Sequence, residues 1–139
     1  MTEKKVIKKY EDLVFSAKLD EAVKLLFQYE QETNKDKIIG FLIGMAPVEY
    51  IGMLVYQTAL LMSEKDKRYL SACCTILTYP LCHFDGAIET AVYHVKKLCN
   101  EYPNELEYWK MYRETIYNAY TIPNKAEIEL IEQNIKKLS

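Results

Sequence analysis

Four side chains able to bind a metal or activate a thiol fall between residues 82 and 99: Cys82, His83, His94 and Cys99. Zinc prefers these ligand types, and a cysteine whose thiol meets a histidine in space forms a nucleophile–base pair. However, no C-x-x-C pair accompanies them, and adjacency of Cys82 and His83 in the chain does not make their side chains converge. We therefore expect reduced, packed thiols and predict no enzyme activity, no cofactor and no bound metal. A thiol- or metal-dependent enzyme is the alternative.

A second group of residues suits binding rather than catalysis. Six aromatic residues and four glutamates lie close together in the chain: Tyr102, Tyr108, Trp109, Tyr112, Tyr117, Tyr120, Glu101, Glu105, Glu107 and Glu114. Tyr and Trp are enriched at binding hot spots, and surrounding carboxylates suit a basic partner. We predict a protein-binding site formed by Glu101, Glu105, Tyr108, Trp109 and Tyr112. The alternative is a wide buried helix whose tyrosine hydroxyls reach solvent.

Composition and charge exclude several classes of protein. The 139 residues are 50% hydrophobic and carry 18 basic and 20 acidic side chains, for a net charge of −2, so no basic excess favours nucleic acid. Residues 1–10 lack the apolar core of a signal peptide. The apolar stretch over residues 38–62 is broken by Pro47, Glu49 and Gln57, so no spanning helix is expected. We predict a cytoplasmic protein that binds neither nucleic acid nor membrane, and leave its oligomeric state open.

One local concentration of positive charge stands out near the start of the chain. Lys4, Lys5, Lys8 and Lys9 repeat at helical spacing, a pattern that can contact phosphate or anionic lipid. Nearby acidic residues dilute it, because residues 1–40 hold eight basic and eight acidic side chains. We therefore interpret the stripe as a solvated helix face.

The elements that must position these residues are helices. Apolar spacing, capping residues and prolines predict eight helices in a single all-α domain over residues 1–139, at about 2–16, 20–32, 36–45, 47–62, 66–79, 85–100, 104–120 and 123–138. Pro47 is placed in the first turn of the fourth helix, Asp85 is an expected N-cap, and Pro123 and Asn124 are expected to start the eighth helix. Gly40 and Gly44 are expected to permit close helix approach. Short connections favour antiparallel hairpins, stacked as a short α-solenoid or an irregular helical bundle.

Two stretches carry a family resemblance. Lys18-Leu19-Asp20-Glu21-Ala22-Val23-Lys24-Leu25 resembles the start of the second helix of a tetratricopeptide unit. Asp66-Lys67-Arg68-Tyr69-Leu70-Ser71-Ala72-Cys73-Cys74 followed by Asp85-Gly86-Ala87-Ile88-Glu89-Thr90-Ala91 resembles a HEAT unit, departing from it at residues 80–84. In size, helical style and Lys-rich, Arg-poor composition, the whole chain resembles small all-α immunity proteins of polymorphic bacterial toxins. That resemblance implies a protein that binds and blocks a cognate toxin domain, often a nuclease. A generic helical-repeat adaptor is the alternative.

Overall fold

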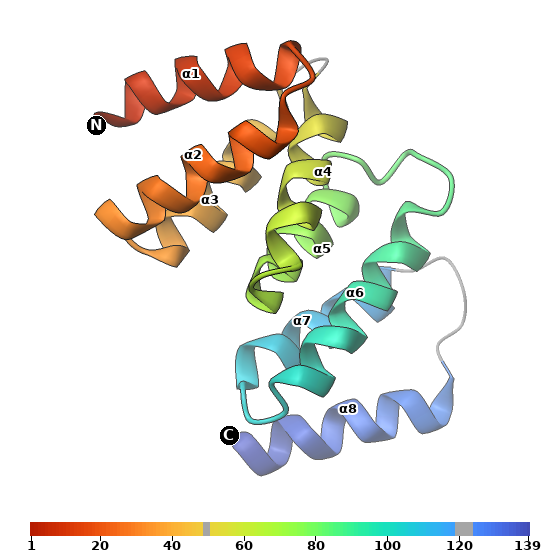
Figure 1. Cartoon of the computed structure of the whole chain (residues 1–139). Coiled ribbons are helices and arrows are strands. Elements are labelled where there is room, and N and C mark those ends of the chain that lie inside the picture. The colour runs from red at the N-terminus through yellow and green to blue at the C-terminus, as the bar shows by residue number, and fades with distance from the viewer. Residues whose placement is uncertain (49–50, 119–123) are drawn as a thin grey trace. The chain divides into compact units, whose positions relative to one another are not determined.

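The computed structural model describes residues 1–48, 51–118 and 124–139, and these residues contain helices and no strands (Figure 1). The helical elements are α1 (Glu3–Phe15), α2 (Leu19–Glu32), α3 (Lys35–Met45), α4 (Gly52–Ser63), the 3-10 helix η1 (Lys67–Tyr69), α5 (Leu70–Thr78), α6 (Ala87–Glu101), α7 (Leu106–Asn118) and α8 (Lys125–Leu138). The predicted all-α class is confirmed. Within the described ranges, no helix is long and apolar enough to span a bilayer.

The chain divides into two compact units. Unit 1 comprises Met1–Ala72 and unit 2 comprises Cys73–Ser139, with the boundary inside α5. Each unit buries its own apolar side chains, among them Leu26 and Leu42 in unit 1 and Leu98 and Ile131 in unit 2. The single domain expected over residues 1–139 stays a prediction, and each unit is described separately below.

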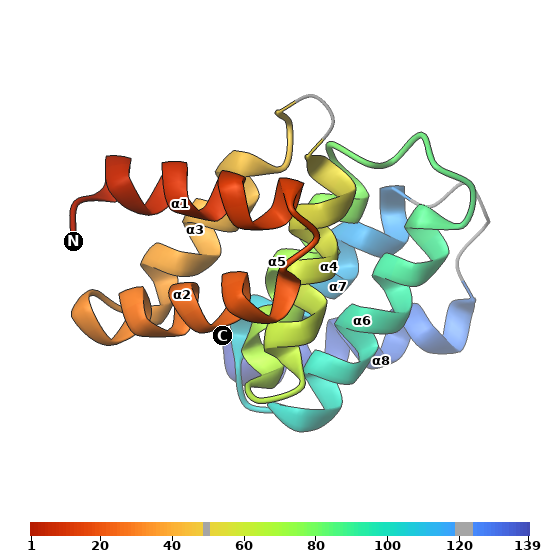
Figure 2. The ribbon, with the colours of Figure 1, turned by 45° about the horizontal axis from the view of Figure 1, so that its top comes forward.

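Unit 1 is organised around Tyr10, a side chain with no exposed surface. Helices α1 and α2 run side by side in opposite directions, and α3 packs on α2 (Figures 1 and 2). The Tyr10 hydroxyl donates to Thr58 Oγ1 of α4 at 2.9 Å, and its ring meets Phe41 of α3 edge to face at 5.6 Å. This residue therefore joins α1 to both α3 and α4, and burial raises the pKa of its hydroxyl to about 12.

Unit 2 contains the consecutive helices α6, α7 and α8, with α7 packed against both of the others (Figure 2). The apolar residues Val95 of α6, Ile116 of α7 and Ile131 of α8 are buried. Cys74 in α5 reaches Thr115 of α7, with 3.4 Å between Sγ and Oγ1. Because the connecting segments are short, sequential helices are neighbours here, as the sequence predicts.

Three local predictions differ from the structure. Pro47 does not begin a helix: Val48 N donates to Met45 O at 3.1 Å, so tight turns follow α3, and α4 begins only at Gly52. Gly86, at φ +80°, rather than Asp85, directly precedes α6. No described atom lies within 4 Å of a Cβ built on Gly40 or Gly44, so the close helix approach expected at these glycines is absent from the described residues. At the start of α8, Asn124 is the N-cap, since its Oδ1 accepts from Ala126 N at 2.8 Å.

Ala17 occupies a backbone conformation that suits glycine. It follows α1 at φ +59°, where Lys18 N donates to Leu13 O at 2.9 Å and closes the helix end. We expect Ala17→Gly to raise the free energy of unfolding by about 1 kcal/mol, because glycine has no Cβ to clash in this region. Ala126→Gly, at an exposed site in the first turn of α8, should lower it by up to roughly 0.5 kcal/mol. Urea unfolding measures the stability change of each variant. If both substitutions changed the free energy of unfolding in the same direction, the strain inferred at Ala17 would be contradicted.

Candidate functional site

The predicted aromatic–acidic residues lie at and around a groove of about 340 Å³ in unit 2, which we call the α6–α8 groove. All three helices contribute to its lining, with Lys96, Cys99 and Asn100 from α6, Trp109 and Tyr112 from α7, and Ala126, Glu127 and Leu130 from α8. Two of the five predicted partner-binding residues therefore line this groove. Its size is at the lower end of the range typical of ligand pockets.

Trp109 and Tyr112 are buried, with 6% and 3% of their surface exposed. Their rings stack at a centroid distance of 6.1 Å and an interplanar angle of 20°. The Trp109 indole N–H donates to the carbonyl of Pro103 at 2.8 Å, so the polar atom of the ring is satisfied within the protein. In the structure these two predicted residues are therefore not exposed anchors. They form part of the wall of the groove instead.

A polar bridge crosses the groove from α6 to α8. Glu127 accepts hydrogen bonds from Lys96 Nζ at 2.8 Å and from the Tyr112 hydroxyl at 2.5 Å. Partial burial acts to raise the pKa of Glu127, but the Lys96 ammonium and the Tyr112 hydroxyl hold it below its usual value. The pKa of Tyr112 is raised, first by burial and then by the Glu127 carboxylate. The bridge therefore keeps Glu127 ionised and Tyr112 protonated near neutral pH.

The remaining predicted residues lie around the turn between α6 and α7. Glu101 ends α6 and Glu105 directly precedes α7, and both are exposed. Tyr108 is half-buried, and its ring lies 5.8 Å from the Tyr102 ring. Among the described residues, neither of these glutamates forms an ion pair, so the turn presents two negative charges to solvent. Glu105 precedes Trp109 by one helical turn, which places the acidic turn next to the residue that walls the groove.

Three further exposed side chains in unit 2 are not among the five binding residues predicted from the sequence. Tyr93 of α6 is 62% exposed, Tyr117 of α7 is 59% exposed and Leu130 of α8 is 49% exposed. Tyr117 belongs to the aromatic cluster but was not among the five predicted residues, and Tyr120 lies outside the described residues. The exposure of Tyr93 could have been predicted from the sequence, because this residue lies outside the apolar helical stripe formed by Ala91, Val95 and Leu98.

The cysteines and histidines are divided between the surface and the core. Cys82 and His83 are exposed in the segment before α6, whereas His94 and Cys99 are buried on α6. Burial raises the pKa of the Cys99 thiol to about 12, so this thiol is protonated and unreactive at neutral pH. Within residues 1–48, 51–118 and 124–139, no group of three or more His, Cys, Asp or Glu side chains is arranged to hold a metal ion.

No family model, curated protein or solved structure matches this chain. The chain's own residues therefore supply the evidence for its function. In unit 2 these residues offer an aromatic-walled groove, an apolar rim at Leu130, and two exposed carboxylates at the α6–α7 turn. Such a surface can bind an apolar side chain of a partner while attracting positive charge beside it.

Proposed function

We propose that this chain is a non-catalytic protein-binding module whose contact surface combines the α6–α8 groove with the acidic α6–α7 turn. The observation that carries the proposal is the placement of exposed Glu101 and Glu105 beside a groove walled by Trp109 and Tyr112. Interfaces commonly join an apolar centre to a polar rim, and charges on that rim speed encounter with a partner of opposite sign.

The most concrete form of this proposal is an immunity protein in the bacterial cytoplasm. It binds a cognate toxin domain, such as a nuclease, and occludes its active site. Nuclease clefts are basic because they hold phosphate, so the carboxylates of Glu101 and Glu105 would neutralise the cleft. The buried rings of Trp109 and Tyr112 act by holding the groove open, and contact is made through Leu130 and the half-buried Tyr108. The resemblance to small helical immunity proteins supports this form.

The test begins with the genes that neighbour the gene for this chain, where we expect a toxin domain to be encoded, and measures whether this chain rescues the growth of cells that express that domain. We expect co-expression of the wild-type chain to restore growth. We expect the double variant Glu101→Lys/Glu105→Lys to lose rescue and to bind the purified toxin at least tenfold more weakly, roughly 1.4 kcal/mol. Both side chains are exposed, so the fold should be unaffected. Glu89→Lys, an exposed charge reversal near the other end of α6, is the matched control and should behave as wild type.

Two results would contradict the proposal in different ways. Unchanged affinity in the double variant would remove the acidic turn from the binding site while leaving the immunity function standing. Failure of the wild-type chain to bind or neutralise the neighbouring toxin would reject that function. Recovery of a regulatory protein, rather than a toxin, in a pull-down from the native cell would then favour the adaptor alternative.

A further inference from the structure

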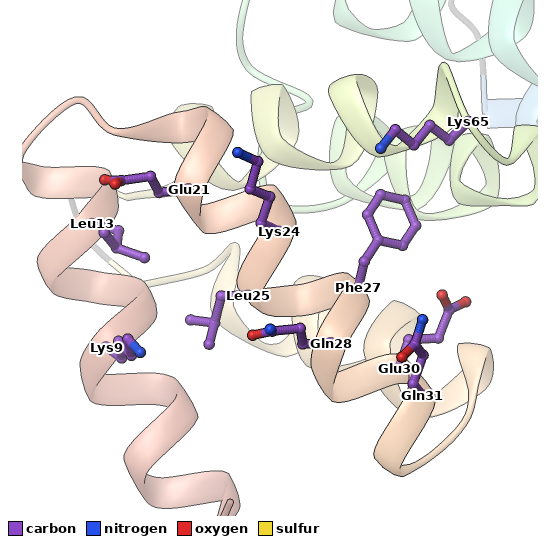
Figure 3. Close-up of a pocket in the computed structure, with 10 residues that line it drawn as sticks. All are labelled: Lys9, Leu13, Glu21, Lys24, Leu25, Phe27, Gln28, Glu30, Gln31 and Lys65. Carbon is purple, nitrogen blue, oxygen red and sulfur yellow. The ribbon is translucent and has the colours of Figure 1, made fainter.

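A second groove, of about 690 Å³, lies in unit 1 between α1 and α2, and we call it the α1–α2 groove (Figure 3). Its lining comes from both helices and from Lys65, which follows α4. It shares no residue with the α6–α8 groove, and its charge has the opposite sign from that of the acidic turn. The proposed function does not use this groove.

The base of the α1–α2 groove is apolar. Leu25 of α2 is only 5% exposed and projects toward half-buried Leu13 of α1, whereas Phe27, also half-buried, projects from the opposite side of α2 toward Lys65 (Figure 3). The Phe27 ring packs edge-on against Tyr69, with a centroid distance of 5.8 Å and an interplanar angle of 89°. Because Tyr69 is fully buried, Phe27 is held in place by the core. The groove therefore offers a fixed apolar base that lies below its charged rim.

The rim of this groove carries a positive excess. Lys9, Lys24 and Lys65 line it, and in the described part of the chain none of these ammonium groups has a carboxylate within ion-pair distance. Lys65 Nζ instead lies over the Phe27 ring, 5.7 Å from its centroid. Glu21 and Glu30 are the counter-charges of the lining, so the lysines exceed the glutamates by one.

Glu30, one of the two glutamates of the lining, is already hydrogen-bonded within unit 1. Glu30 Oε1 accepts from Lys35 Nζ at 2.7 Å and from the Tyr69 hydroxyl at 2.9 Å. The same ammonium also pairs with Asp66 at 2.5 Å, so Lys35 compensates the charge of Glu30 only in part. The three lysines of the lining still outnumber its two glutamates, so an approaching segment with carboxylates meets a favourable potential above an apolar base.

We propose that the α1–α2 groove binds an acidic amphipathic segment of a partner protein. Apolar side chains of that segment cover Leu13 and Leu25, and its carboxylates meet Lys9 and Lys24 (Figure 3). The amides of Gln28 and Gln31 on the same lining can hydrogen-bond to polar groups of the bound segment. The positively charged rim favours a negatively charged ligand. Covering the apolar base requires apolar side chains as well, which a small anion lacks. A flat bilayer surface is disfavoured, because Leu25 is recessed.

The test uses short fluorescein-labelled peptides and the full chain, read out by fluorescence anisotropy at low salt. The probe is a helical peptide of glutamate and leucine with the leucines on one face. One comparison peptide replaces every glutamate with lysine, and another replaces every leucine with serine. We expect binding of the first peptide to be at least tenfold tighter than that of either comparison.

Charge-reversal variants locate the binding site. Lys9→Glu/Lys24→Glu should weaken binding of the acidic peptide by about tenfold or more, because two favourable contacts become repulsive. Lys4→Glu/Lys5→Glu makes the same charge change at exposed positions on α1 that do not line the groove, and should weaken it less than threefold. All four lysines are exposed, so circular dichroism should show an unchanged fold for both variants.

Several outcomes would overturn the proposal. Equal weakening by the two double variants would show general attraction to charge rather than a site. If the peptide with serine in place of leucine bound as tightly as the acidic leucine peptide, the groove would bind anions without using its apolar base. Tighter binding to vesicles containing phosphatidylserine than to the acidic peptide would assign the lysines to a membrane. Absence of binding to the acidic peptide would reject the groove as a peptide site.

Discussion

Replacing Trp109 with alanine is expected to lower the free energy of unfolding by about 4 kcal/mol, the range seen when large buried aromatic residues are truncated. The side chain is 6% exposed, stacks on Tyr112 and donates its N–H to Pro103 O. Removing it leaves a cavity between α7 and its neighbours and breaks the hydrogen bond that ties α7 to the α6–α7 turn. This loss is a large part of the total stability of a typical small protein.

Far-UV circular dichroism during urea unfolding measures this loss without relying on tryptophan fluorescence, because Trp109 is the chain's one tryptophan. Tyr117→Ala on the same helix is the matched control: its side chain is 59% exposed and should cost less than about 0.5 kcal/mol. Trp109→Phe should fall between the two, since it keeps a stacked ring and loses the N–H donor. Equal costs for Trp109→Ala and Tyr117→Ala would contradict the burial of Trp109.

The buried position of Trp109 also changes how binding data must be interpreted. A Trp109→Ala protein that fails to bind a partner shows a disturbed unit 2, and such a result says nothing about direct contact. The exposed residues Glu101 and Glu105 can be changed without that ambiguity. For this reason the proposed binding surface is tested through its carboxylates.

The helices could be predicted because their signal is local. In α6, the apolar residues Ile88, Ala91, Val95 and Leu98 recur at helical spacing, and all four are buried. Helix ends were harder to place, because competing local hydrogen bonds of similar strength decide them. After α3, i→i+3 bonds around Pro47 continue the chain as turns, where the proline rule alone predicted a new helix.

The two grooves could not be predicted from the sequence, because long-range packing decides which faces of a helix are covered. Trp109 and Tyr117 belong to the same aromatic cluster, yet α6 and α8 bury the first and leave the second exposed. In the basic stripe of α1, Lys8 pairs locally with Asp12 while Lys9 turns toward α2. Its groove partners, Lys24 and Lys65, are distant in the chain, so no local pattern joins these three lysines.

Replacing Lys35 with methionine is expected to cost about 2 kcal/mol at neutral pH, in line with hydrogen bonds to charged groups. Its ammonium lies 2.7 Å from Glu30 and 2.5 Å from Asp66, and 5.4 Å from the centroid of the Tyr69 ring. The two carboxylates are 18% and 25% exposed, so without Lys35 they remain close together, poorly hydrated and without their shared cation. This single residue therefore ties α2 and α3 to the segment before η1.

The cost of Lys35→Met should depend on pH. Burial alone acts to raise the pKa of Asp66, but hydrogen bonds from Lys35 and from the backbone N–H of Arg68 hold it below its ordinary value. A carboxyl whose pKa is lower in the folded state contributes stability above its unfolded pKa of about 4 and loses it as pH falls through the folded pKa. In the Lys35→Met variant that contribution to stability is smaller, so lowering the pH destabilises the wild type more than the variant. The stability difference between the two proteins should therefore shrink from neutral pH to below pH 4.

Urea unfolding at neutral pH and in acid measures that difference. Lys37→Met is the matched control, because Lys37 also lies on α3 but forms an exposed pair with Glu3 at 3.5 Å, and should cost less than about 0.5 kcal/mol at any pH. Adding Asp66→Asn to Lys35→Met should recover part of the loss, since it removes one of the two uncompensated charges. A pH-independent cost for Lys35→Met would show that its methylene chain, rather than its charge, holds these segments together.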